Sequence, residues 1–186
     1  TLSVDFGGVG FFAYVALNTN LAAAAGVLGA VVTSWLVVKK PDLSMMLNGA
    51  IAALVAITAA CAFVAPWAAI LIGGVAGVIV VLGSLLVERL RIDDPIGAIA
   101  AHGMAGVWGT LALGFLTVPA LAEKLATGGP GLLYGGGFHQ LGIQALGLGL
   151  AAGRPRQGPV PLRVGRRGAR RAVRPDSGVA HRDPRL

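Results

Sequence analysis

His102 is the residue of this sequence whose type and position point most directly to chemistry. It follows Pro95 by seven residues within a long apolar stretch. At about 1.5 Å per residue, a helix that starts at Pro95 would carry His102 roughly 10 Å inward. If that helix spans a membrane, a titratable side chain at this depth is costly and is a functional hypothesis by default.

The chemistry open to His102 is proton exchange, because a neutral imidazole offers one hydrogen-bond donor and one acceptor to a weak base in a dry channel. The residues expected beside it on the helix are mostly small: Ala98, Ile99, Ala105, Gly106 and Gly109. Small neighbours leave space at the ring, and we expect Ala98 and Gly106 to line a path past it. A histidine that only bonds to a neighbouring helix is the alternative, and position alone leaves both open.

Asp93, Asp94 and Pro95 stand where that helix should begin. Carboxylates in a first turn suit the positive end of a helix, and proline suits the first helical position. We therefore expect a structural role in starting the helix.

Other polar residues carry weaker signals. His139 follows three glycines, and we expect it to be solvated. Several polar residues within the apolar stretches are better explained by hydrogen bonds between helices than by a polar path: Asn18, Thr19, Asn20, Asn48 and Thr58.

Signatures of soluble enzymes are missing from the sequence, which has no Walker loop, no G-x-S-x-G, no H-E-x-x-H and no Cys/His cluster. We therefore expect no enzyme activity, no cofactor and no metal. Cys61, the single cysteine, fits a small buried hydrophobe.

The composition indicates a membrane protein. Hydrophobic residues make up 55% of the 186 residues and charged residues 12%, whereas a soluble domain has about 25% charged residues. A membrane-spanning helix needs about 20 apolar residues. Four such stretches are expected at 11–38, 43–63, 67–87 and 96–118, and a fifth starts near Leu132. They lack the alternation of barrel strands, so the predicted fold is an all-α, polytopic transmembrane helix bundle.

Glycines inside these stretches predict close helix packing. Gly73 and Gly77 form a small-xxx-small stripe, and Gly103, Gly106 and Gly109 crowd the fourth stretch. In lipid, small residues allow the close backbone contact that holds helices together.

The distribution of charged residues between the loops predicts how the helices are oriented in the membrane. Residues 39–42 contain two lysines and 88–95 two arginines, while 64–67 contain no charged residue. Because positive loops stay inside, we expect these two basic loops and the C-terminus to be cytoplasmic. Residues 151–186 hold ten arginines against two acids and account for the net charge of +7. Since this tail has no aromatic residue, nucleic-acid binding is not expected.

Several segments resemble the ammonium transporter (Amt/Mep/Rh) family. They are ALNTNLAAAAG (16–26), LNGAIAALVAITAACAFVAP (47–66), IDDPIGAIAAHGMAGVWGT (92–110) and GLLYGGGFHQL (131–141). The order and spacing of these segments agree with the family over about residues 10–150.

The resemblance implies the second half of an eleven-helix fold, built from an inverted repeat, in a homotrimer whose subunits each have a narrow apolar pore in the cell membrane. His102 matches the second of two pore histidines. The implied function is transport of ammonium or ammonia across the bilayer, with a PII-type signal protein as a partner on the cytoplasmic face.

Two departures qualify this expectation. The first repeat has no counterpart here, so we expect a fragment. The match also ends near Leu150, and we hypothesise that 151–186 form a disordered or out-of-frame basic tail after a transporter-like region at 1–150. A non-conducting ammonium sensor and an inactive truncated gene product are the alternative functions.

Overall fold

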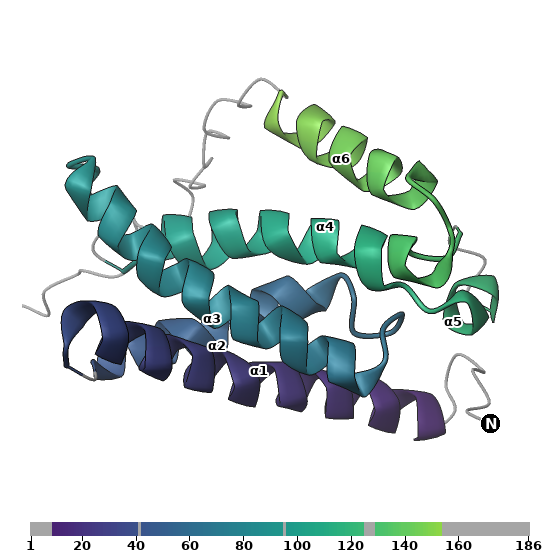
Figure 1. Cartoon of the computed structure of the whole chain (residues 1–186), viewed down its shortest axis with the longest axis horizontal. Helices are drawn as coiled ribbons and strands as arrows, with labels where there is room; N and C mark the ends of the chain where they lie inside the picture. Colours follow the sequence, from purple (N-terminus) through teal and green to yellow (C-terminus); the bar gives the residue numbers. More distant parts are fainter. Residues whose placement is uncertain (1–8, 41, 95, 125–128, 154–186) are drawn as a thin grey trace, which may run out of the picture. The chain divides into compact units, whose positions relative to one another are not determined.

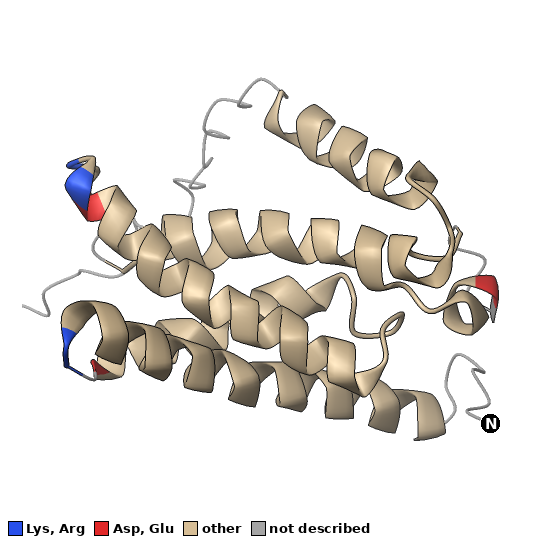
Figure 2. Cartoon of the chain, viewed as in Figure 1, with Lys and Arg blue, Asp and Glu red and all other residues tan. Residues whose placement is uncertain are grey.

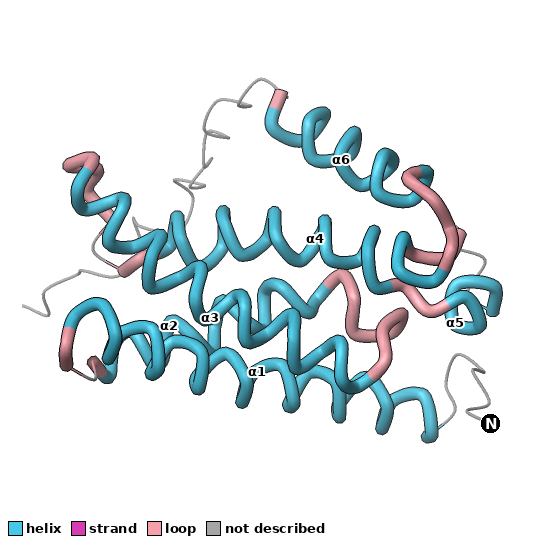
Figure 3. Tube along the Cα trace, viewed as in Figure 1, coloured by secondary structure: helices cyan, strands magenta, loops and turns pink. Residues whose placement is uncertain are grey.

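The computed structural model describes residues 9–40, 42–94, 96–124 and 129–153, and these form helices and their connections with no strand among them (Figure 1, Figure 3). The all-α prediction is confirmed. In chain order the elements are α1 (Val9–Val38), α2 (Leu43–Thr58), α3 (Pro66–Arg89), the π-helix η1 (Ile99–Met104), α4 (Ala105–Leu116), the short α5 (Pro119–Lys124), the 3-10 turn η2 (Leu132–Tyr134) and α6 (His139–Ala152).

Three of the helical stretches within the described residues are long and apolar enough to cross a membrane: Gly10–Val38, Pro66–Arg89 and Ile99–Leu116. Their surfaces are apolar too, since Leu28, Trp35 and Leu36 on α1 are each at least 65% exposed. The charged residues of the bundle lie at or next to helix ends (Figure 2). A helix that is apolar all round and charged only at its ends suits lipid, and the chain is a multi-pass membrane protein.

The second predicted stretch is shorter than expected, because α2 ends at Thr58 and turns follow it to Val64. Side chains of α1 replace the missing helical hydrogen bonds. Asn18 Nδ2 donates to the carbonyls of Cys61 (2.8 Å) and Val64 (3.0 Å), and Tyr14 Oη donates to Val64 O (2.6 Å). With these carbonyls paired, the chain can leave the helix early and turn within the bundle.

The last predicted stretch also begins later than expected. Residues 132–134 form only the turn η2, and α6 starts at His139. Gly135 and Gly137 between them have φ values of +84° and +64°, a left-handed conformation that glycine adopts readily and that interrupts a helix.

Of the polar residues expected to bond between helices, only Asn18 and Asn48 bond outside their own helix. Asn18 bonds to the turn after α2, and Asn48 Nδ2 donates to Ile96 O at 3.3 Å. The prediction is wrong for Thr19, Asn20 and Thr58, whose side chains donate to carbonyls four residues earlier in their own helices. Such bonds within a helix are open to short polar side chains in lipid.

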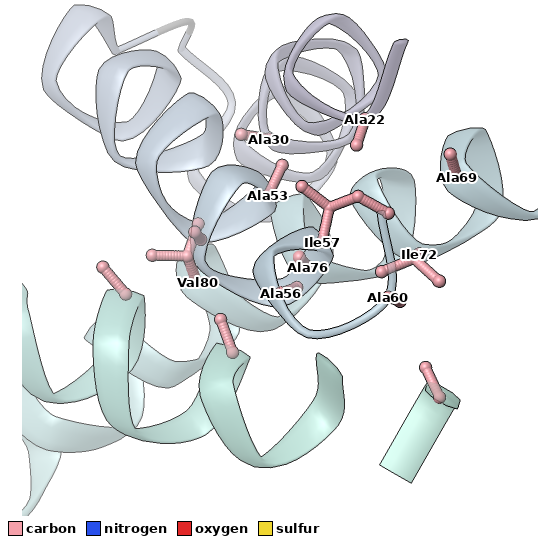
Figure 4. Close-up of a cluster of buried hydrophobic side chains, with 14 of the residues drawn as sticks. Ala22, Ala30, Ala53, Ala56, Ile57, Ala60, Ala69, Ile72, Ala76 and Val80 are labelled. Carbon is pink, nitrogen blue, oxygen red and sulfur yellow. The ribbon is translucent and has the colours of Figure 1, made fainter. Parts of the chain in front are cut away.

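The core is built mainly from alanine. Ala22 and Ala30 of α1 meet Ala53, Ala56 and Ile57 of α2 and a row of small and branched residues on α3, among them Ala69, Ile72, Ala76 and Val80 (Figure 4). All of these side chains are at most 1% exposed. Small side chains allow the helix backbones to approach closely, so backbone atoms make many of the contacts.

Gly73 shows how close this approach is. A Cβ atom at Gly73 would lie 2.1 Å from the carbonyl oxygen of Ala22 in α1, whereas one at the neighbouring Gly74 would have no atom within 4 Å. The packing role expected for Gly73 is therefore confirmed.

We predict that Gly73→Ala destabilises the protein and Gly74→Ala does not. The added methyl at Gly73 meets backbone, which cannot rotate away, and the cost is about 1–3 kcal/mol. The measurement is the free energy of unfolding in detergent micelles. Equal effects of the two substitutions would contradict the close contact of α1 and α3.

Asn18 supplies a second prediction. Asn18→Leu keeps the size of this fully buried side chain but removes the side-chain donor of the Cys61 carbonyl and leaves the Val64 carbonyl with Tyr14 alone, at a cost of about 1–3 kcal/mol. The control is Asn20→Leu, because Asn20 is exposed and bonds only to Ala16 of its own helix. Comparison of the two unfolding free energies checks the role of Asn18, and a stable Asn18→Leu variant would refute it.

Candidate functional site

The carboxylate of Asp94 caps the start of the helix that carries His102. Its two oxygens accept hydrogen bonds from the backbone N–H groups of Ala98 and Ile99, both at 2.9 Å. These N–H groups have no partner within the helix, and a carboxylate at this end is also favoured by the helix dipole. Asp93 is exposed, and Pro95 lies outside the described residues.

His102 lies in a π-helix rather than in regular α-helix. The wide turn runs from Ile99 to Met104, and the N–H of Ala105 at its end donates to the carbonyl of Ala100, five residues back. π-Turns within α-helices are rare and are frequent at functional sites. The helical stretch begins later than the sequence predicts, so that His102 is its fourth residue and lies nearer to its start than expected.

His102 lies on the side of this helix that does not pack against the core, which we call its open side. Ala100, Ala101 and Ala105 are buried in the core, whereas His102 and Gly103 are exposed. The imidazole of His102 forms no hydrogen bond or ion pair with another described residue, so its ring nitrogens stay available for a partner.

The two residues predicted to line a path lie on this side as well. Ala98 is exposed, and Gly106 is half-buried with only Val55 Cγ1, at 3.7 Å, near a Cβ built on it. A Cβ at Gly103 would meet nothing within 4 Å. Little side-chain volume therefore crowds the ring from its own helix. By contrast, Gly109 packs against the backbone of α2, where a Cβ would lie 2.1 Å from Ala56 O.

An apolar groove of about 490 Å³ runs beside this helix. Its lining comes from α3, η1 and α4: Ile79, Ile99, Gly103, Met104, Val107, Trp108 and Leu111. Trp108 fixes one wall, since its indole Nε1 donates to Ile72 O of α3 at 3.1 Å. This groove could not be predicted from the sequence, because its lining residues look like any other lipid-facing set until the helices are paired.

A polar hollow of about 380 Å³ lies where the start of α2, the end of α3 and the segment before η1 meet. Four carboxylates line it together with Asn48 and Ser84: Asp42, Glu88, Asp93 and Asp94. Within the described ranges, no group of three His, Cys, Asp or Glu side chains is arranged to hold a metal ion. That Asn48 and Asp94 line the same hollow could not be predicted from the sequence, since α2 and the η1 segment are far apart in the chain.

Comparison with known proteins shows to which family the chain belongs. A model of the Ammonium Transporter Family matches residues 6–153. The chain belongs to the ammonium transporter family. It is 48% identical over 126 residues to the ammonium transporter Amt2 of Archaeoglobus fulgidus, an alignment that covers 65% of this chain and 26% of that protein.

Solved structures agree with this membership. A structure described as a sensor Amt protein superposes with a TM-score of 0.66 at 37% identity, over 77% of this chain and 34% of the other. Mep2 of Candida albicans superposes with a TM-score of 0.66 at 32% identity, over 75% and 31%. The chain thus spans about a quarter to a third of the length of its family relatives. These relatives are transporters and not enzymes, and ammonium transport is the function the family supports in general.

We predict that Asp94→Ala loosens the start of the helix in front of His102. Loss of both hydrogen bonds should cost about 1 kcal/mol locally, as for other helix caps. Hydrogen–deuterium exchange of the peptide that contains residues 98–104 should therefore become several-fold faster. Asp93→Ala is the matched control, because Asp93 is exposed in the same segment. Unchanged exchange in Asp94→Ala would show that the cap contributes nothing.

Proposed function

We propose that this chain forms one part of an ammonium transporter and contributes His102 to a narrow apolar pore for ammonium or ammonia. The observation that carries the proposal is the exposed imidazole of His102, free of partners among the described residues, on the open face of a membrane-length helix. Small residues flank it, so a small amine can approach the ring.

The proposed chemistry is transfer through an apolar path past a neutral imidazole. An ammonium ion is costly in a medium of low dielectric constant, so it transfers its proton to water or to the imidazole and passes as neutral ammonia. The imidazole nitrogens can donate to or accept from the neutral amine and can hold a proton transiently. Ala98 and Gly106 would line this path. The opposite wall, with the other histidine that the family resemblance implies, would come from sequence beyond this chain.

The proposed setting is the cell membrane, with the C-terminus in the cytoplasm. The basic residues after α1 and at the end of α3 lie at the same end of the bundle (Figure 2), which agrees with one positive, cytoplasmic side. A homotrimer and a PII-type protein at that side are the partners we propose, on the strength of family membership. We further propose that the chain consists of a transporter-like region at 1–150 and a basic tail at 151–186.

A non-conducting ammonium sensor is the second candidate. The observation that favours it is the 37% identity to the structure described as a sensor Amt protein, over 77% of this chain. An inactive truncated product is the third. Transport activity separates the first candidate from the other two.

The test is uptake of labelled methylammonium by transporter-deficient cells that express the longest reading frame containing this sequence. We expect His102→Ala to lower uptake at least tenfold. His102→Gln keeps a donor and an acceptor but cannot carry a proton, so a comparable loss in this variant would point to proton exchange rather than simple polar contact.

The control for this test is His139→Ala, since His139 is an exposed histidine at the start of α6 and should not affect uptake. Membrane insertion is monitored by the amount of protein in the membrane fraction. Full uptake by inserted His102→Ala protein would contradict the proposed transport role of His102. Absent uptake by the inserted parent protein would favour the sensor or the inactive product.

A further inference from the structure

The segment in front of η1 is held by the helix α2 as well as by its own carboxylate. Asn48 of α2 donates from Nδ2 to the carbonyl of Ile96 at 3.3 Å. The carboxylate of Asp94 in the same segment accepts hydrogen bonds from the backbone N–H groups of Ala98 and Ile99. The backbone between Asp94 and Ile99 is therefore tied at two points.

Gly97 is the residue that lets these two contacts coexist. Its φ is +69°, which is strained for any residue with a side chain. A Cβ on Gly97 would also lie 2.9 Å from Asn48 Nδ2 and 3.4 Å from Ser84 Oγ. The position thus needs glycine for its conformation and for the space that Asn48 occupies.

The tied segment leads directly into the turn that carries His102. The carbonyl of Gly97 accepts from Ala101 N at 2.9 Å, and the π-turn follows without interruption. If the start of the helix shifted by one residue, the face it presents would rotate by about 100°. Such a shift would turn the imidazole away from the open side towards the core.

We propose that Asn48 is a positioning residue, whose amide bond to Ile96 across Gly97 sets the start of η1 and with it the direction of the His102 ring. An amide suits this place because it donates a hydrogen bond without bringing charge. Aspartate has the same shape but no donor, and it would place a carboxylate against the Ile96 carbonyl. The effect on transport rests on the function proposed above, whereas the effect on the ring does not.

The experiment records the imidazole ¹⁵N and ¹³C resonances of histidine-labelled protein in lipid nanodiscs, expressed from the longest reading frame that contains this chain. The His102 signals are those lost in His102→Gln. We expect Asn48→Asp to move them by several linewidths and to leave the His139 signals in place. Uptake of methylammonium should fall at least fivefold in maximal rate with little change in apparent KM.

Ser84→Ala is the matched control. Ser84 lines the same polar hollow and faces Gly97 from α3, but it makes no hydrogen bond to the segment before η1 within the described residues. Its removal should leave both the His102 signals and uptake unchanged. A general loss of stability would affect the two variants alike, whereas loss of positioning would affect only the Asn48 variant.

A second pair of variants covers failure of Asn48→Asp to insert. Gly97→Ala should also displace the His102 signals, and Gly97→Ala combined with Asn48→Ala should displace them no further, because both changes act on the same contact. Unmoved His102 signals in the Asn48 and Gly97 variants, or equal movement in Ser84→Ala, would overturn the proposal. Moved signals with full uptake would instead retain the positioning role and overturn the transport role of His102.

Discussion

The structure depends on one constraint: the lipid interior offers no water to hydrogen-bond the backbone, so every N–H and C=O group at that depth needs a partner within the protein. Helices meet this requirement along most of the chain. Where the chain leaves helical structure, side chains take over. Asn18 and Tyr14 pair the carbonyls of the turn after α2, and the Asp94 carboxylate pairs the free N–H groups at the helix in front of His102. Polar side chains thus stand where helices begin and end.

Because lipid is as apolar as leucine, burial of large side chains does little to hold such helices together. Alanine and glycine take the place of a bulky core, and close backbone contact supplies the packing. Gly73 on Ala22 and Gly109 on Ala56 are the clearest cases, since neither contact leaves room for a methyl group. The same small residues have a different consequence around His102, where Gly103 has open space beside it. Small residues therefore serve tight packing on the core side of a helix and leave open space on its other side.

These two properties meet in the helix formed by η1 and α4. Its alanine side is fixed in the core, its start is tied by Asp94 and Asn48, and its other side presents an imidazole with no partner among the residues that the structure describes. The transport function that we propose would match this arrangement, because ammonia is a small weak base and the ammonium ion loses its charge when it loses a proton. The apolar groove next to this helix and the polar hollow at its start show how sharply polarity changes over a short length of the bundle.

By itself, the sequence determined the all-helical membrane fold and the family, whereas His102 as the pore residue stays a prediction. Long uncharged stretches and short contiguous motifs are local signals, and they survive without knowledge of neighbours. Only the tertiary structure decided that α2 stops at Thr58, that His102 sits in a π-turn near the start of its helix, and that Asn48 reaches Ile96. The end of α2 and the Asn48 contact depend on partners far away in the chain, since Asn18 pairs the carbonyls of the turn after α2 and Asn48 pairs that of Ile96. A short polar side chain in an apolar stretch bonds to its own helix or to another, and the choice is made by which backbone group lies unpaired within reach.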